Sequence, residues 1–232
     1  MLDIAKHKLM LVQVLKDIYS DVDIASSLGF KGGTALYLFY DLPRFSVDLD
    51  LNLLNAGDKE SVFKKIGDIC GRHGTIKDQA MKLHTMLYEV SYGASDRNMK
   101  IEISERKFPD SYELKQYFGI PVQVMKKPDM LAHKMAALLD RKRLAVRDVF
   151  DIWFLMKERA PVAKSVFDAR VKEEWRAYLT RCRAVIEEID NRYILQGLGE
   201  LLDDTMKTWA KNNLKKEALF LIDFYRDNPI VV

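Results

Sequence analysis

Residues 45–53, with the sequence FSVDLDLNL, alternate between apolar and polar side chains. This period of two predicts a half-buried β-strand, with the valine and leucines on one face and Asp48 and Asp50 on the other. Because Asp is disfavoured within strands, two of them on the same face need an explanation. Carboxylates two residues apart on a strand point the same way and can bind divalent cations that prefer oxygen ligands. The alternative is an exposed sheet face that carries two acids.

A turn precedes this strand. Gly32-Gly33 predicts a tight turn, and Thr34 stands where the N-cap of a helix is expected, ahead of the helix-compatible run ALYLFYDL and a stop at Pro43. Glycines let a backbone approach a ligand closely, and a hydroxyl with free amides at a helix start suits a phosphate. The alternative is an ordinary capped turn. A phosphate-binding feature and a metal-binding feature within twenty residues of each other favour a ligand site.

The remaining pattern predicts an α+β chain. Up to residue 125 we expect helices over residues 3–20 and 58–74, the second closed by Gly71 or Gly74, together with strands over 82–92, 98–105 and 120–124. The turn-like residues 93–96 join the first two of these strands into a hairpin. From Lys127 onward nearly all of the chain has helical periodicity. The predicted organisation is therefore mixed α/β over residues 1–125 and helical over residues 126–232.

A third carboxylate lies in the run MKIEIS, where Glu102 falls on the polar face of a strand. If this strand neighbours the Asp48–Asp50 strand, Glu102 either completes a three-carboxylate metal site or acts as the general base for an attacking hydroxyl. The alternative is a cross-strand ion pair.

The run KGGTALYLFYDLPRFSVDLDL, residues 31–51, resembles the opening motif of the AbiEii/AbiGii-type toxin family. This family is a branch of the polymerase-β-like nucleotidyltransferase superfamily, and Arg44 and Ser46 fit its Arg-x-Ser-x-Asp-Leu-Asp pattern. The resemblance implies a polymerase-β-like lobe with a small mixed sheet over residues 1–125, followed by a helical bundle over 126–232 that completes the active site. It further implies metal binding by Asp48, Asp50 and Glu102, and nucleotide binding by Gly32, Gly33, Thr34, Arg44 and Ser46.

Residues 127–156 resemble the later motifs of the same family. By that likeness Lys134 contacts the nucleotide phosphates, and Asp148, aided by Asp151, has a catalytic or lysine-positioning role. A lysine is a point-charge partner for a triphosphate, and two acids three residues apart share a helix face. The alternative is a structural ion pair between Lys134 and Asp148.

The function implied by the resemblance is Mg²⁺-dependent transfer of a nucleotidyl group from an NTP to RNA, with tRNA as the expected acceptor. The protein would be the toxin of a toxin–antitoxin or abortive-infection system, with a cognate antitoxin as partner. Two alternatives stay open: a nucleotidyltransferase that acts on a small molecule or a protein hydroxyl, and a non-catalytic nucleotide-binding module. Paired acids disfavour the last alternative, because without a metal they repel a triphosphate.

Composition adds limits to this hypothesis. A net charge of +3 is too small to indicate nucleic-acid binding by itself. The N-terminal residues are charged throughout and no stretch of about 18 apolar residues occurs, which predicts a cytoplasmic protein with no membrane partner.

Overall fold

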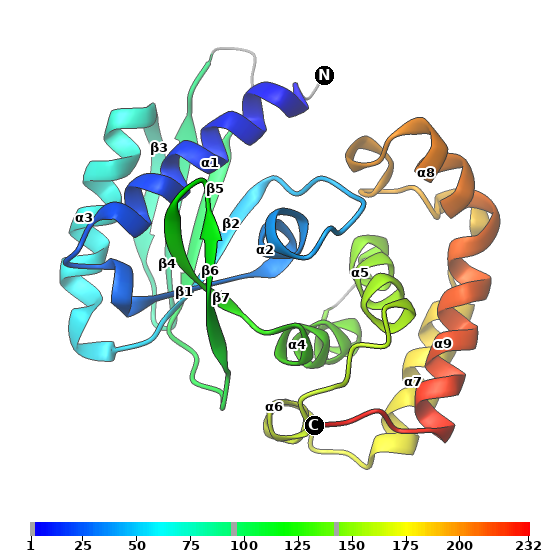
Figure 1. Cartoon of the computed structure of the whole chain (residues 1–232). Helices are drawn as coiled ribbons and strands as arrows, with labels where there is room; N and C mark the ends of the chain where they lie inside the picture. Colours follow the sequence, from blue (N-terminus) through cyan, green and yellow to red (C-terminus); the bar gives the residue numbers. More distant parts are fainter. Residues whose placement is uncertain (1–2, 94–96, 142–143) are drawn as a thin grey trace. The chain divides into compact units, whose positions relative to one another are not determined.

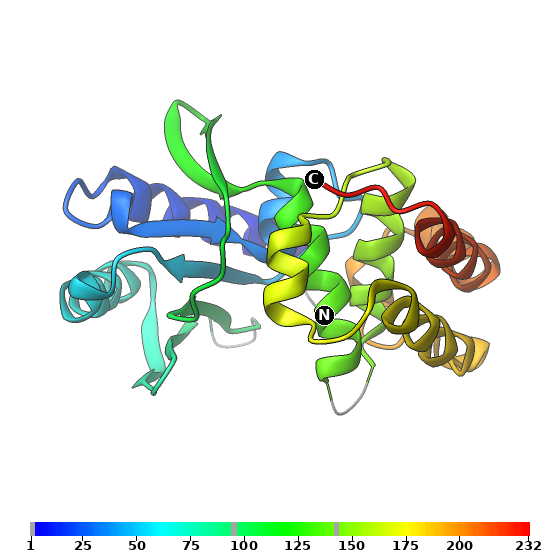
Figure 2. The ribbon, with the colours of Figure 1, turned by 90° about the horizontal axis from the view of Figure 1, so that it is seen from below.

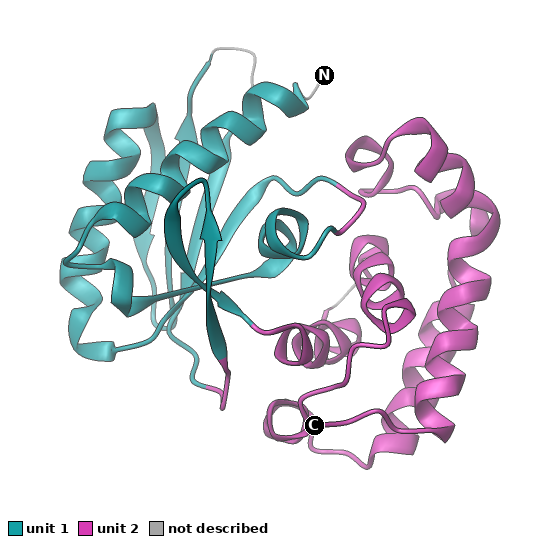
Figure 3. Cartoon of the chain, in the orientation of Figure 1, with its two compact units in different colours: residues 1–41, 45–107, 112–125 teal, residues 42–44, 108–111, 126–232 magenta. Residues whose placement is uncertain are grey.

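The computed structural model describes all residues except 1–2, 94–96 and 142–143 (Figure 1). Two compact units divide the chain, as coloured in Figure 3: unit 1 comprises residues 1–41, 45–107 and 112–125, and unit 2 comprises residues 42–44, 108–111 and 126–232. Strands form the sheet of unit 1, whereas unit 2 is built from helices. The mixed α/β fold predicted from the sequence is confirmed.

Unit 1 contains a seven-stranded mixed sheet of strand order β3-β4-β5-β2-β1-β7-β6. The strands are β1 (Leu28–Lys31), β2 (Asp48–Leu53), β3 (Thr75–Met81), β4 (Thr85–Ser91), β5 (Met99–Ser104), β6 (Tyr112–Tyr117) and β7 (Ile120–Met125). At the centre, β2 runs antiparallel to β1 and parallel to β5. The leucines of β2 are buried, which confirms the half-buried strand predicted from the alternation.

The helices of unit 1 are α1 (Ile4–Ser20), α2 (Gly32–Phe39) and α3 (Lys59–His73), with 3-10 turns at Ala25–Ser27 and Ala56–Asp58. The apolar residues of α1 recur at helical spacing, and Leu11, Leu15 and Ile18 are buried. α1 packs against α3 and against the sheet (Figure 1). Both helices were predicted, and Gly74 ends α3 as expected.

The structure agrees with the predicted hairpin but differs from the prediction in several strands and in the bounds of one helix. The hairpin is confirmed, since β4 and β5 pair antiparallel, but residues 94–96 of its turn lie outside the described residues. β1, β3 and β6 were not predicted. β3 and β6 are edge strands without a fully buried side chain, so neither shows the apolar alternation of a half-buried strand, and β1 has only four residues. The helix after the Gly-Gly turn ends at Phe39, ahead of Pro43, and begins at Gly32 rather than after Thr34.

Unit 2 contains α4 (Lys127–Asp140), α5 (Val146–Lys157), α6 (Lys164–Arg170), α7 (Trp175–Glu187), α8 (Asp204–Trp209) and α9 (Lys215–Asp227). Short 3-10 turns occur at Asn191–Tyr193 and Gly199–Leu201, and a π-helical turn at Ala210–Leu214 joins α8 to α9. Ten of the twelve residues of α5 are buried, and Asp148 and Asp151 are among them. α7 and α9 lie side by side in Figures 1 and 2.

Candidate functional site

The two acids of β2 lie together on one face of the sheet. Asp48 and Asp50 are half-buried, while Leu49 and Leu51 between and after them are fully buried on the opposite face. Buried leucines fix the strand, so the direction of both carboxylates is set by the core rather than by a mobile loop.

Glu102 lies beside Asp50. The parallel pairing of β2 with β5 puts Asp50 opposite Glu102 and Asp48 opposite Lys100, so the condition attached to Glu102 in the sequence analysis is met. Desolvation raises the pKa of Glu102, and the carboxylates of Asp50 and Asp48 raise it further, whereas Lys31 and Arg106 lower it. Mutual repulsion among these acids is the electrostatic condition that a bound divalent cation relieves.

Lys31 is the functional neighbour that the sequence analysis left without a role. It ends β1 and is the register partner of Asp50 on the other side of β2 from Glu102. A row of Lys31, Asp50 and Glu102 therefore crosses three strands. In the sequence, only the position of Lys31 directly before the Gly-Gly turn indicated that it lies near these acids.

Gly32 is required by the close approach of α2 to the acids. Its φ is +80°, and a Cβ at this position would lie 2.3 Å from Oδ2 of Asp50. Any side chain would therefore collide with the carboxylate in addition to straining the backbone. The glycine of the predicted turn is explained by both requirements.

Thr34 has a different role from the one predicted. The N-cap of α2 is Lys31, so the prediction that Thr34 caps the helix is wrong. Thr34 is fully buried, and its hydroxyl donates a hydrogen bond of 2.5 Å to the backbone carbonyl of Asp48. The proton of this hydroxyl is therefore donated within the protein, and phosphate binding by Thr34 stays a prediction. The side chain fixes the start of β2, where the first acid stands.

The carboxylates do not form a preassembled three-ligand cage. Among the residues that the structure describes, no group of three or more His, Cys, Asp or Glu side chains is placed to hold a metal ion. Asp48 and Asp50 converge from one strand, with Glu102 on the next. These oxygen donors fit a hard cation in chemical type.

In unit 2, Lys134 on α4 lies between two acids of α5. Its Nζ is 3.0 Å from Oδ1 of Asp148 and 2.7 Å from Oδ2 of Asp151, and only 18% of the lysine side chain is exposed. Arg141 adds a contact to Asp148, with 2.9 Å between Nε and Oδ2. The ion pair that the sequence analysis kept as an alternative is therefore present, and it extends to both acids.

Arg44 belongs to the same cluster. Its guanidinium is 3% exposed and makes a bidentate contact with Asp151, with donor–acceptor distances of 2.6 and 2.7 Å. Burial acts to raise the pKa of Asp151, but Arg44 and Lys134 outweigh it and leave that pKa lowered. Desolvation acts to lower the pKa of Lys134, and Asp151 and Asp148 leave it raised. The pairing explains why an arginine stands at position 44: a planar guanidinium binds a buried carboxylate through two parallel bonds.

Two other predicted nucleotide-binding residues, Gly33 and Ser46, are buried in unit 1. Gly33 is the second residue of α2, and Ser46 precedes β2. Nucleotide binding by these two residues stays a prediction.

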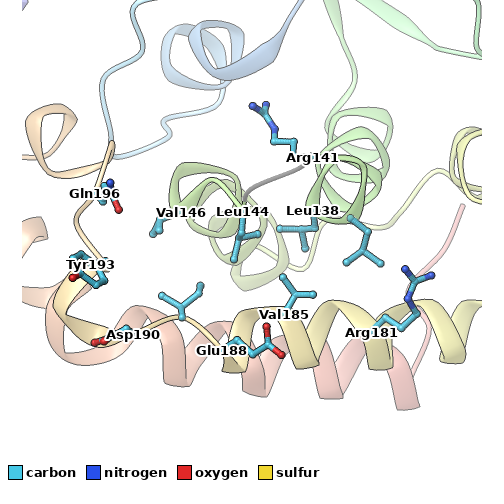
Figure 4. Close-up of a pocket in the computed structure, with 12 residues that line it drawn as sticks. Leu138, Arg141, Leu144, Val146, Arg181, Val185, Glu188, Asp190, Tyr193 and Gln196 are labelled. Atoms are coloured by element: carbon cyan, nitrogen blue, oxygen red, sulfur yellow. The ribbon is translucent and has the colours of Figure 1, made fainter.

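A separate pocket of about 530 Å³ lies within unit 2 (Figure 4). Leu138, Leu144 and Val185 supply apolar lining, and Tyr193 and Glu188 supply polar groups. None of the predicted catalytic residues lines it, although Arg141, the partner of Asp148, does.

Two solved structures from Helicobacter pylori share the fold. The protein JHP933 is 19% identical, with a TM-score of 0.63 over 98% of this chain and 94% of that one. A protein assigned as a nucleotidyltransferase is 20% identical, with a TM-score of 0.63 over 96% and 94% of the two chains. The chain therefore shares the fold of these two proteins.

The model of the family "Nucleotidyl transferase AbiEii toxin, Type IV TA system" matches residues 13–218. The chain belongs to this family and is an enzyme of the nucleotidyltransferase class, as the resemblance of its motifs predicted. No protein of curated function matches it in sequence. No helix in the described part of the chain has the length and apolar character needed to cross a membrane.

Proposed function

We propose that this toxin-family enzyme transfers a nucleotidyl group from an NTP to a hydroxyl of RNA, with Mg²⁺ as cofactor and tRNA as the expected acceptor. The observation that carries the proposal is the register of Asp50 with Glu102 beside Asp48, because three carboxylates on one sheet face suit divalent cations. Bound there by Asp48 and Asp50, Mg²⁺ would activate the attacking oxygen and stabilise the charge on the leaving pyrophosphate.

Glu102 is our candidate for the general base. In the proposed reaction the acceptor oxygen bonds to the α-phosphorus, the bond to pyrophosphate breaks, and the hydroxyl proton passes to a carboxylate. The raised pKa of Glu102 makes it a better proton acceptor than an ordinary glutamate. Asp148, the other residue considered for this role, already binds Lys134 and Arg141. We therefore assign it to holding the lysine.

Lys134 remains a proposed phosphate contact. The cluster in unit 2 contains three cations, Arg44, Lys134 and Arg141, against two acids, Asp148 and Asp151. Among the described residues of this cluster the cations outnumber the acids, which favours an anionic ligand. Backbone amides at Gly32 and Gly33 are the second proposed phosphate contact, in place of the Thr34 hydroxyl.

Labelled NTPs test the proposal. The purified protein is incubated with Mg²⁺, total RNA and each α-labelled NTP in turn, and the label in RNA is measured. We expect incorporation by the wild type and at least a hundredfold less by Asp48→Asn and Asp50→Asn, which keep the side-chain shape but weaken metal binding. Asp78→Asn changes an exposed acid of β3 and is the matched control.

Two other outcomes would contradict different parts of the proposal. If the label enters a small molecule or a protein instead of RNA, the acceptor is wrong and the enzyme class stands. If Asp48→Asn and Asp50→Asn label as well as the wild type, the assigned carboxylates are wrong. Growth arrest on expression of the wild type, absent with these variants, is the expected result for a toxin whose cognate antitoxin is missing.

A further inference from the structure

Unit 1 carries a surface on which one exposed and three half-buried aromatic rings gather beside a lysine. It consists of Tyr37 and Phe39 on α2, Tyr117 and Phe118 at the tip of the β6–β7 hairpin, and Lys8 on α1. We call this surface the hairpin platform. The strands of this hairpin, β6 and β7, form one edge of the sheet (Figure 1).

Phe118 is the feature of the platform that folding does not explain. Its side chain is 83% exposed, although it is a large apolar residue. Its φ is +47°, and Gly119 follows with a φ of +80°, so the pair forms the two-residue turn between Tyr117 and Ile120. Such turns prefer Asn-Gly, and a bulky residue at positive φ is an outlier. A strained and exposed aromatic residue indicates selection for binding rather than for stability.

The neighbouring rings connect this tip to the core. The ring centroids of Tyr117 and Phe118 are 4.7 Å apart, and those of Tyr117 and Phe39 are 5.3 Å apart. Phe39 in turn contacts the buried ring of Phe30 at 6.1 Å. Contacts between neighbouring aromatic rings thus hold Tyr117 and Phe118 in place, which reduces the entropy lost when a ligand stacks on them.

Positive charge adjoins the rings. Nζ of Lys8 lies 5.0 Å from the ring centroid of Tyr37. Lys115 lies over Tyr40 at 4.7 Å, but Glu113 is 3.2 Å from its Nζ and offsets its charge. Lys8 is therefore the cation that we expect to meet an anionic ligand.

We propose that the hairpin platform binds unpaired bases of the RNA acceptor, with Phe118 and Tyr117 as stacking surfaces and Lys8 as a phosphate contact. Aromatic rings beside a cation are the means by which proteins hold single strands, because every base offers a face for stacking. This proposal rests on the RNA acceptor proposed above.

The position of the platform fits that acceptor. α2 begins at Gly32, against the carboxylate of Asp50, and ends at Phe39, against Tyr117. Eight helical residues span about 12 Å. A strand stacked on the platform is therefore within a few nucleotides of the acids that we assign to catalysis.

The test uses Phe118→Asn in the full chain. Asn-Gly is the preferred pair for this turn, so the variant removes the ring while keeping or raising the melting temperature. Phe220→Asn, at an exposed phenylalanine of α9, is the control. Binding of a fluorescein-labelled single-stranded oligoribonucleotide is followed by anisotropy, with its duplex for comparison. We expect Phe118→Asn to weaken single-strand binding about tenfold or more, and Phe220→Asn to leave it unchanged.

A second variant tests the charge. Lys8→Gln should reduce the slope of the logarithm of the binding constant against the logarithm of salt concentration by about 0.7, the value for one phosphate contact on a single strand. The proposal is overturned if the wild type binds no single strand or if Phe118→Asn binds it like the wild type. It is also overturned if Phe118→Asn keeps its binding to RNA and loses only its binding to a protein.

Failure of the platform and failure of the proposed function give different results. The Asp48→Asn variant should bind RNA as the wild type does, since it leaves the platform intact. RNA binding without nucleotide incorporation contradicts the proposed function and supports the platform. Incorporation into RNA by the wild type, with RNA binding unchanged in Phe118→Asn, overturns the platform and leaves the proposed function standing.

Discussion

Asp50 and Glu102 are register partners across the parallel strands β2 and β5, so two carboxylates stand side by side on one sheet face. Like charges placed directly across a sheet destabilise it. A fold that retains them has a use for them. Burial raises the pKa of Glu102, and the carboxylates of Asp50 and Asp48 raise it further.

Removing one charge of this pair should stabilise the metal-free protein. The folded-state pKa of Glu102 is raised, so its ionisation opposes folding: the penalty grows as the pH rises from 4.5 through the folded pKa and is complete above it. Glu102→Gln should therefore raise the melting temperature at pH 7.5 by about 1–2 °C, since solvent screening keeps the gain small.

The gain should vanish below about pH 4.5, where wild-type Glu102 is protonated in both states, and it should shrink when Mg²⁺ is added. Thermal unfolding at a series of pH values, with EDTA or Mg²⁺, measures this. A gain that is the same at pH 4 and pH 7.5 contradicts the assignment.

The same substitution should impair catalysis. Loss of a general base typically costs 10²- to 10⁴-fold, so we expect Glu102→Gln to lower nucleotide incorporation by at least about a hundredfold. Glu89→Gln, on the neighbouring strand β4, is the control and should stay near wild-type activity.

Gly32→Ala should lower the free energy of unfolding for two reasons, and a control variant distinguishes between them. The new Cβ would lie 2.3 Å from Oδ2 of Asp50, and the φ of +80° disfavours any side chain. Gly197 has a φ of +67° with open space around it, so Gly197→Ala reports the backbone strain alone. We expect about 1–2 kcal/mol for Gly197→Ala and about 2–4 kcal/mol for Gly32→Ala in urea unfolding. Equal losses would show that the close approach to Asp50 is unimportant.

Thr34 should affect stability and activity because its hydroxyl holds the backbone of Asp48 in place. Thr34→Val keeps the shape of the side chain but removes the donor to the Asp48 carbonyl, which should cost about 1–2 kcal/mol and lower activity. Thr34→Ser keeps the hydroxyl and should retain more activity at a comparable loss of stability. If the serine variant is the less active of the two, packing of the methyl group matters more than the hydrogen bond.

Asp151 should be essential to unit 2, because its removal leaves Arg44 and Lys134 buried without their shared partner. Breaking such a pair costs about 3–5 kcal/mol, which urea unfolding of Asp151→Asn should show at pH 7. The lowered pKa of Asp151 means that its contribution is present above 3.8 and lost as the pH falls through the folded value, so the difference from wild type should narrow below about pH 4. Lys65→Met, at a surface ion pair of α3, should barely shift the midpoint.

The sequence by itself determined the features that depend on neighbours along the chain. The alternation over residues 45–53 predicted β2 and the common direction of Asp48 and Asp50, because side chains alternate across a strand. Glycine and the apolar period predicted the turn at Gly32, the helix α3 ended by Gly74, and the helical second half. Together with the motifs around Asp48 and Lys134, these patterns also predicted the family.

Only the tertiary structure decided how distant segments meet. The parallel register that puts Glu102 beside Asp50 depends on strand pairing, which local pattern does not specify. Burial of Thr34 under Asp48 and the pairing of Arg44 with Asp151, 107 residues later, follow from packing. The polar edge strands β3 and β6 exist because the sheet offers them hydrogen-bond partners, whatever their own side chains favour. Contacts between residues far apart in sequence are stabilised only once the core has formed, and for that reason no local pattern could reveal them.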